Sequence, residues 1–197
     1  MKLVIMTQPM FFVEEDKILT LLFEEGMERL HLHKPDASPI YSERLLSLMS
    51  DDVYKRIVVH DNYYLKAEYG LGGIHIEDPM AGMPDRYKGK FSRECYDINH
   101  IAPLKKKAEY VLLDRVFNDD NPDRQSLIEQ AAAKGIIDKH VYAKGGINID
   151  TIRRAKELGF GGVVVCHDLW SKFNIHSQLD FKELVGHFDR LRNVANA

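Results

Sequence analysis

Histidine and acidic side chains recur along this chain at the ends of short apolar runs. His31, His33, His60 and His75 each lie within or directly after such a run, and Glu77 follows the last of them. Imidazole gains and loses a proton near neutral pH, and a carboxylate can do so when its pKa is tuned. The same side chains ligate zinc or iron. The pattern therefore indicates acid–base chemistry or a metal site.

The four histidines leave two interpretations open, a metal site and a hydrogen-bonded interior. The sequence contains no H-x-x-E-H motif, which would place two histidines on one helix face, and this weighs against a metal-dependent lyase or hydrolase. We favour hydrogen-bonded interior positions for His31 and His75. His33 and His60 lie nearer the ends of their runs, and we expect them to contact a ligand.

Glycines around the last two apolar runs indicate an anion site. Gly145 and Gly146 precede a helical pattern, while residues 161–167 end with Cys166 and His167 before another turn. Glycine lets the backbone approach an anion closely, and free N–H groups at a helix start favour negative charge. We expect a phosphate site here, with simple tight turns as the alternative. A Gly146→Val exchange should then block binding and leave the fold mostly intact.

Short β-rich runs alternate with helical patterns along the whole chain. Seven of them are followed by a polar loop and a helical period, and a weaker run at residues 90–92 fills the gap before the helical pattern at 96–107. The seven runs are residues 3–6, 29–33, 57–60, 73–76, 109–113, 141–143 and 162–166. Repeated strand–helix units indicate a parallel sheet covered by helices.

Eight such units predict a single-domain (β/α)8 TIM barrel over residues 1–197. A length of about 200 residues is small for this fold, so one or two helices must be degenerate, and residues 80–87 are the candidate. The alternative, an open doubly wound sheet, needs fewer strands. Barrels carry their sites at the carboxyl ends of the strands, and strand alternation places the four histidines inside the barrel or at its mouth.

Two of the predicted helices are marked by their end residues. Residues 148–159 repeat apolar side chains at helical spacing, with Asn148 as the N-cap and Gly159 beyond the last turn. Pro122 and Gly135 mark the ends of another apolar stripe in the same way.

Composition excludes several classes of protein. The chain of 197 residues has 27 Lys and Arg against 30 Asp and Glu, a net charge of −3, which argues against a strongly basic nucleic-acid binder. Its apolar runs are shorter than the roughly 20 residues that cross a bilayer, and the first is too short for a secretory signal. We expect a cytoplasmic protein without membrane or nucleic-acid partners, with Cys95 and Cys166 as reduced thiols.

The order and spacing of six segments resemble the thiamin phosphate synthase and thiazole tautomerase family, or thiamin phosphate pyrophosphorylase-like proteins. The resemblance spans residues 3–170 and is specific as an ensemble. The segments are Leu30-His31-Leu32-His33-Lys34, Val59-His60-Asp61, Gly73-Ile74-His75-Ile76, Ala108-Glu109-Tyr110-Val111, Ala143-Lys144-Gly145-Gly146-Ile147 and Gly162-Val163-Val164-Val165.

The resemblance implies a (β/α)8 barrel, usually a homodimer, that binds a phosphorylated thiazole. It places the phosphate on Gly145, Gly146 and the backbone of Cys166 and His167. In the synthase branch, hydroxymethylpyrimidine pyrophosphate loses pyrophosphate with the help of Mg²⁺, and the thiazole nitrogen attacks the resulting cation. The tautomerase branch moves a proton on the thiazole and needs no cofactor.

The chain departs from the synthase branch where cations are needed for a leaving pyrophosphate. On the second strand the family's arginine is absent, and Lys34, one place before the family's lysine, is the substitute substrate-binding cation. On the third strand only the metal-binding aspartate is kept, as Asp61. The family's Thr-x-Thr-Lys lid reads as the acidic stretch 118–121.

The chain also departs from the tautomerase branch. The Ser-x-His-Ser segment of that branch reads Ser92-Arg93-Glu94-Cys95, so Glu94 replaces the acid–base histidine and Ser92 stays as a substrate-binding residue. His33 or His60 would be the catalytic partner of Glu94, and Arg93 would point outward. We therefore favour proton transfer over condensation. Synthase activity and a non-catalytic thiazole- or thiamin-phosphate-binding protein are the alternatives.

Overall fold

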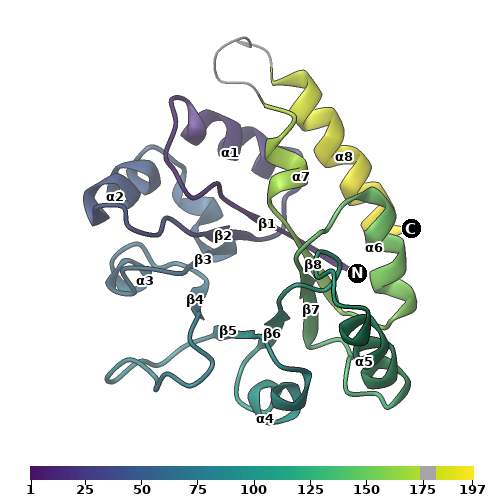
Figure 1. Cartoon of the computed structure of the whole chain (residues 1–197). Coiled ribbons are helices and arrows are strands. Elements are labelled where there is room, and N and C mark those ends of the chain that lie inside the picture. The colour runs from purple at the N-terminus through teal and green to yellow at the C-terminus, as the bar shows by residue number, and fades with distance from the viewer. Residues whose placement is uncertain (174–180) are drawn as a thin grey trace.

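Eight parallel strands form a closed barrel in the computed structural model, which describes residues 1–173 and 181–197 (Figure 1). The strands are β1 (Lys2–Met6), β2 (Leu30–Leu32), β3 (Ile57–Val59), β4 (Gly73–Ile76), β5 (Phe91–Cys95), β6 (Tyr110–Leu113), β7 (Val141–Lys144) and β8 (Gly162–Val165). Each strand pairs with the next, and β8 pairs with β1 so that Lys2 lies opposite Gly162. The predicted barrel is confirmed, and the open sheet is excluded.

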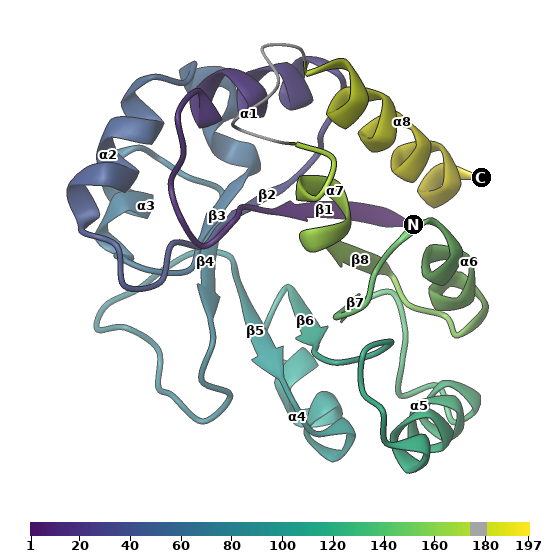
Figure 2. The same cartoon turned by 45° about the horizontal axis from the view of Figure 1, so that its top comes forward.

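Helices surround the barrel on its outer side (Figures 1 and 2). They are α1 (Glu15–Glu24), α2 (Pro39–Ser47), α3 (Tyr64–Glu68), α4 (Ile101–Lys105), α5 (Pro122–Ala133), α6 (Ile149–Glu157), α7 (His167–Trp170) and α8 (Lys182–Asn196), with 3-10 helices at Asp51–Arg56 and Ile98–His100. α3 and α4 have only five residues each. None of the described helices is long and apolar enough to cross a membrane.

The connection between β4 and β5 replaces a helix with a loop. Residues 77–90, all of them described, contain only turns and extended segments, so the prediction of a degenerate unit at 80–87 is confirmed. Arg93 on β5 points outward, as predicted, and its guanidinium donates to the carbonyls of Pro79 and Ala81 at 2.9 and 2.7 Å. One guanidinium therefore secures the segment that covers this part of the barrel.

The ends of α5 and α6 follow the sequence signals. The Asn148 side chain accepts from the backbone N–H groups of Asp150 and Thr151, which caps the otherwise unpaired donors of the first turn. Gly159 lies beyond the end of α6 with φ +83°, a left-handed conformation that glycine adopts without steric cost. Pro122 begins α5, as predicted.

The interior of the barrel is apolar on one side and polar on the other. The apolar side is a small cluster on β1, β6, β7 and β8, separate from the larger core that contains the outward-facing strand residues and the helices. Its members are Val4, Met6, Tyr110, Leu112, Tyr142 and Val164. The polar side consists of buried residues on or next to β2, β3, β4 and β5, namely His31, His60, His75, Ser92 and Glu94.

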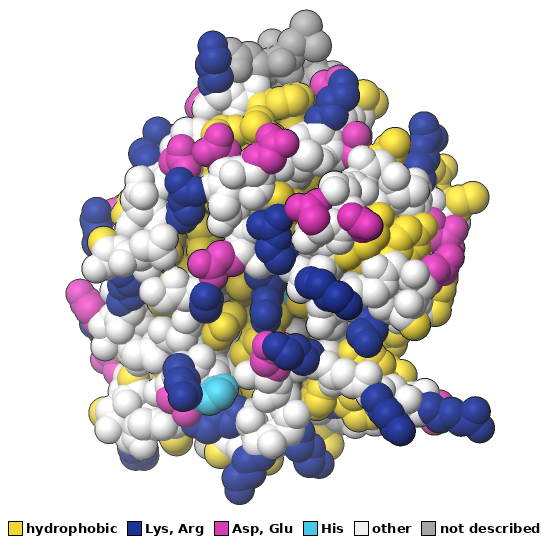
Figure 3. Space-filling model, turned by 180° about the vertical axis from the view of Figure 1, so that it is seen from behind, with side chains coloured by type: hydrophobic (Ala, Val, Ile, Leu, Met, Phe, Trp, Pro, Cys, Tyr) yellow, Lys and Arg dark blue, Asp and Glu magenta, His cyan; other side chains and the backbone are white. Residues whose placement is uncertain are grey.

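β5 is longer than the strand that the sequence predicts at this position. The prediction placed it at residues 90–92, whereas β5 runs from Phe91 to Cys95. Ser92 and Glu94 face the polar half of the interior, so this strand lacks apolar residues at its inward positions, which weakens the pattern by which strands are recognised. Figure 3 shows the opposite side of the molecule from Figure 1, where both signs of charge occur, in keeping with the net charge of −3.

Candidate active site

A cavity of about 500 Å³ lies where β6, β7 and β8 end and brings the predicted phosphate-binding residues together. Gly145, Gly146, Cys166 and His167 all line it. Its other lining residues are Met6, Asp114, Asn118, Lys144, Ile147, Asn148, Val164, Asp168 and Ser171. The cavity lies at the end of the barrel where this fold carries its sites.

Backbone donors are available around this cavity. Within the described part of the chain, the N–H groups of Gly146, Ile147 and His167 have no hydrogen-bond acceptor. These three residues line the cavity, and unpaired N–H groups at the start of a helix favour an anion. The arrangement therefore suits a phosphate group.

The two glycines are required by the backbone rather than by a ligand. Gly145 and Gly146 have φ values of +90° and +69°, and a Cβ atom on Gly146 would lie 2.7 Å from the backbone carbon of Phe117. A side chain at Gly146 would thus collide with the β6–α5 connection instead of entering the anion site. The expectation that Gly146→Val leaves the fold mostly intact is therefore incorrect.

Glu94 and Lys144 form an ion pair between the barrel interior and the cavity. Lys144 Nζ lies 2.9 Å from Glu94 Oε2 and 3.8 Å from Asp114 Oδ1. Burial raises the pKa of Glu94, although the Lys144 ammonium acts in the opposite direction. Burial also disfavours the charged form of Lys144, but the Glu94 carboxylate outweighs it and raises the pKa of Lys144. Lys144 therefore stays charged beside a carboxyl group that accepts a proton readily.

The two carboxylate oxygens of Glu94 differ in their hydrogen bonding. Glu94 Oε2 also contacts His75 Nε2 at 3.2 Å, and His75 Nδ1 contacts the Ser92 hydroxyl at 2.8 Å. Glu94 Oε1 is buried and has no hydrogen-bond partner among the described residues. An unsatisfied buried carboxylate oxygen costs free energy, so its persistence suggests a site that a bound molecule completes.

A hydrogen-bonded chain runs through the polar half of the interior. It joins Tyr110 OH to His31 Nε2 at 2.6 Å, His31 Nδ1 to His60 Nε2 at 2.8 Å, and His60 Nδ1 to Glu77 Oε1 at 3.0 Å. His33 Nε2 reaches the same Glu77 oxygen at 2.9 Å. The interior positions predicted for the histidines are confirmed.

The protonation states along the chain follow from burial and from the Glu77 carboxylate. Burial lowers the pKa of His60 to about 3, and it lowers that of His75 to about 3 with help from the Lys144 ammonium. Hydrogen bonds from His33 and His60 hold the pKa of Glu77 well below its usual range. Ionised Glu77 only accepts, so His60 carries its proton on Nδ1, and His31 consequently donates from its own Nδ1.

The sequence predicts His33 or His60 as the catalytic partner of Glu94, whereas in the structure other side chains separate both histidines from Glu94. The His60 and His75 rings stack with centroids 4.3 Å apart, and it is His75 that contacts Glu94. His33 stacks on the other side of His60 at 4.7 Å. Among the described residues, His60 therefore reaches Glu94 through His75, and His33 reaches it through His60 and His75.

Lys34 is engaged in a buried ion pair. Its ammonium lies 2.6 and 2.8 Å from the two carboxylate oxygens of Glu15, and both side chains are nearly inaccessible, at 1% and 2% exposure. It also donates to the Met10 carbonyl at 3.0 Å. The structure thus gives Lys34 an internal partner in place of the free substrate-binding cation that the sequence suggested.

Asp61 lies beside the histidines but outside the groups that could share a metal ion. Its Oδ2 accepts from the Lys34 backbone N–H at 3.3 Å. Among the described residues, the groups close enough for one metal are His31 with His60 and His75, and His33 with His60 and Glu77. The metal-binding role of Asp61 stays a prediction.

The sequence pattern assigns no role to Lys144 or Glu15. Lys144 lies two residues after Tyr142 on β7 and so shares the inward direction of that side chain, which is the signal that could identify it. Glu15 begins α1, where an acidic side chain is common, and nothing in the sequence distinguishes it as the partner of Lys34.

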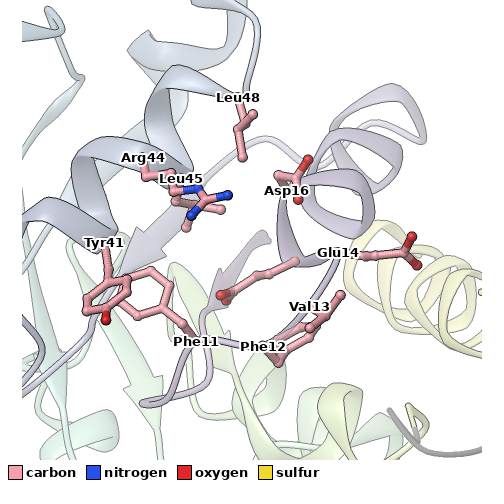
Figure 4. A pocket seen from close by; sticks show the side chains of 10 residues that line it. Phe11, Phe12, Val13, Glu14, Asp16, Tyr41, Arg44, Leu45 and Leu48 are labelled. Atoms are coloured by element: carbon pink, nitrogen blue, oxygen red, sulfur yellow. The ribbon is translucent and has the colours of Figure 1, made fainter.

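A second cavity, of about 430 Å³, lies between the segment before α1 and helix α2 (Figure 4). Figure 4 shows Phe11 beside Tyr41, with Arg44 and Leu45 further along α2. The Phe11 and Tyr41 rings lie 5.7 Å apart. None of the predicted site residues lines this cavity.

Comparison with known proteins places the chain in a family. No family model matches the sequence, and no curated protein matches it. A solved structure of a thiamine phosphate pyrophosphorylase from Bacteroides thetaiotaomicron is 40% identical, with a TM-score of 0.92 over 100% of this chain and 98% of that chain.

More distant structures share the fold. A thiamine phosphate pyrophosphorylase from Pyrococcus furiosus is 17% identical, with a TM-score of 0.73 over 99% of this chain and 95% of that chain. A tryptophan synthase α-subunit from the same organism is 13% identical, with a TM-score of 0.67 over 98% and 97% of the two chains. The identity of 40% over essentially the full length of both chains carries the assignment, and this chain belongs to the thiamine phosphate pyrophosphorylase family.

Proposed function

We propose that this protein is an isomerase of thiamin biosynthesis that transfers a proton on a phosphorylated thiazole. The observation that carries the proposal is the unpartnered Glu94 Oε1, buried beside Lys144. Lys144 also lines the cavity of Gly145 and Gly146, so a molecule with its phosphate in that cavity could present its ring to Glu94.

The phosphate would be held mainly by backbone donors. The free N–H groups of Gly146, Ile147 and His167 supply hydrogen bonds, and the Lys144 ammonium supplies positive charge against the nearby Asp114 and Asp168 carboxylates. The Asp168 carboxylate accepts a hydrogen bond from His187 Nε2 at 2.6 Å, which fixes its orientation. Cys166 contributes its backbone to the wall of the cavity.

Glu94 is suited to both halves of a proton transfer. Its Oε2 is fixed by His75 and Lys144, which leaves Oε1 to take a proton from the thiazole ring and return it at another ring position. A carboxyl group whose pKa is raised by burial is a stronger base when ionised, and it holds the transferred proton readily. The Lys144 ammonium would stabilise the negative charge that develops on the ring.

The charges around the mouth favour proton transfer over condensation. A departing pyrophosphate needs cations, but Lys34 is neutralised by Glu15, and Glu77, Asp61 and Asp114 add negative charge. The alternative, thiamin phosphate synthase activity, is favoured by the name of the 40% identical structure. That reaction would use Mg²⁺, and the two imidazole nitrogens beside the Glu77 oxygen suit the oxygen-seeking Mg²⁺ poorly.

Two assays on the purified protein separate the candidates. In the first, NMR follows hydrogen–deuterium exchange and isomer conversion of thiazole carboxylate phosphate in the absence of Mg²⁺. We expect conversion, and we expect Glu94→Gln to lower kcat by about 10²–10⁴-fold, the contribution of one acid–base group.

In the second assay, hydroxymethylpyrimidine pyrophosphate, thiazole phosphate and Mg²⁺ are supplied together. Formation of thiamin phosphate here, without any isomer conversion in the first assay, would show that the protein is a thiamin phosphate synthase and would refute the isomerase proposal. Tight binding of both ligands with no chemical change in either assay would make the protein a binding protein.

A further inference from the structure

We infer that His33, His60 and Glu77 form a binding site for one divalent zinc-class metal ion, distinct in ligand chemistry from a magnesium site. The three side chains come from the carboxyl ends of β2, β3 and β4, which are neighbours in the barrel. Each residue offers one ligand atom, and these three atoms all lie within 4.8 Å of one another. The inference does not depend on the isomerase proposal.

The spacing of these atoms needs little adjustment to hold a metal. Glu77 Oε1 lies 2.9 Å from His33 Nε2 and 3.0 Å from His60 Nδ1. Zinc bonds of about 2.0–2.1 Å in tetrahedral geometry separate two ligand atoms by about 3.3 Å. A small movement of the Glu77 carboxylate away from both nitrogens would therefore give this separation.

The choice of metal follows from the ligand types. Two imidazole nitrogens and one carboxylate oxygen suit zinc, iron and related ions, whereas magnesium takes oxygen ligands. Three protein ligands also leave a coordination position open, as in catalytic zinc sites. The His33 and Glu77 side chains are 23% and 45% exposed, so an ion can reach this position from solvent.

His31 and Tyr110 can supply the hydrogen bonds that the second ring nitrogen of a metal-binding His60 needs. A ligating imidazole donates its other N–H to a fixed acceptor. With a metal on His60 Nδ1, His60 Nε2–H would donate to His31 Nδ1, and His31 Nε2–H would donate to Tyr110 OH, over the present distances of 2.8 and 2.6 Å. Each group keeps one proton. The ring protons of His31 and His60 change nitrogen, that of His33 moves from Nε2 to Nδ1, and the Tyr110 hydroxyl turns so that its oxygen accepts.

The binding test uses the metal-free protein with Zn²⁺ alone as the probe, in competition with a chromophoric chelator and against Mg²⁺. We expect one Zn²⁺ per chain that a large excess of Mg²⁺ does not displace. His33→Gln alters a partly exposed ligand and should weaken Zn²⁺ binding by more than about 100-fold. Tyr110→Phe removes only the distant acceptor and should weaken it by about 10-fold, the lower end for an outer partner.

Three results would overturn the inference. They are failure to bind Zn²⁺, displacement by an equal concentration of Mg²⁺, and undiminished affinity in His33→Gln, since the last would place the ion elsewhere. The matched control is His100→Gln, which removes a 57% exposed histidine and should leave affinity unchanged. A further readout is the ¹⁵N NMR signal of His31, which should show its proton moving from Nδ1 to Nε2 on addition of Zn²⁺.

Discussion

The ammonium of Lys144 lies 2.9 Å from Glu94 Oε2 and also lines the cavity formed at the ends of β7 and β8. This one contact joins the two halves of the candidate active site, the proposed anion-binding backbone and the proposed acid–base carboxyl group. Under the proposed function, Lys144 should influence both phosphate binding and proton transfer.

Replacing Lys144 by Met should reduce turnover and change its pH dependence. The ammonium lowers the pKa of Glu94, so its removal lets that pKa rise further. Because the ionised carboxylate is the base, the acid limb of the kcat profile should move to higher pH, and kcat should fall about 10²-fold. Steady-state kinetics across pH measure both effects. A Lys144→Arg variant keeps the charge and should retain the wild-type acid limb; an unshifted profile in Lys144→Met would contradict the assignment.

The buried pair of Lys34 and Glu15 should matter for stability. Glu15→Gln leaves the ammonium buried without a counter-charge, and we expect a loss of about 3–5 kcal/mol in the free energy of unfolding. Urea denaturation measures the loss. The double variant Glu15→Leu with Lys34→Met removes both charges and should recover most of it; a double variant as unstable as the single one would argue against this account.

Gly146→Val should destabilise the protein through the backbone, and Gly135→Val is its matched control. Both glycines have nearly the same φ, +69° and +66°, so both variants incur a left-handed strain of about 1–2 kcal/mol. At Gly146 the new side chain also collides with Phe117, whereas no described residue lies within 4 Å of a Cβ on Gly135. Thermal unfolding should therefore show a clearly larger decrease in Tm for Gly146→Val. Equal decreases would show that the collision is relieved.

The stability of the protein should fall as the pH is lowered below neutrality. His75 has a folded-state pKa of about 3 against 6.5 in the unfolded chain, because it is buried and lies near the Lys144 ammonium. Between these values the unfolded chain binds a proton that the folded chain does not. For this group, the free energy of unfolding therefore decreases by up to about 1.4 kcal/mol for each unit by which the pH is lowered.

A comparison of His75→Gln with the wild type isolates that contribution. Urea unfolding at pH 7, 6 and 5 should give a shallower pH dependence for the variant, whatever its absolute stability. The matched control is His100→Gln, which makes the same exchange at an exposed histidine. A slope in His75→Gln as steep as that of the wild type would mean that His75 is protonated in the folded state.

The repeating pattern of strands and helices predicted the barrel correctly because each unit carries its own signals. Asn148 and Gly159 mark the ends of α6 through local hydrogen bonding and backbone conformation, which depend on a few neighbouring residues. β5 was predicted too short for the opposite reason. Its inward residues Ser92 and Glu94 are suited to a polar interior, and that interior exists only when four strands come together.

The candidate site was predicted in part, and the limits are physical. Parity along the strands placed His31, His60 and His75 inside the barrel, since alternation is a local property. The pairing of Lys34 with Glu15 spans 19 residues, and that of Lys144 with Glu94 spans 50. Such partners depend on how distant elements pack, so the sequence suggested a free cation at Lys34 and gave no role to Lys144.

The barrel interior is apolar on one side and polar on the other, and this division separates the packing that stabilises the fold from the groups that can do chemistry. Val4, Leu112 and Val164 fill one side of the barrel interior through apolar contacts. These contacts do not depend on which ionisable groups lie on the opposite side. The side formed by β2 to β5 can therefore exchange its ionisable groups during evolution without dismantling the scaffold. A single chain of this size can in this way combine a stable architecture with an ionisable interior.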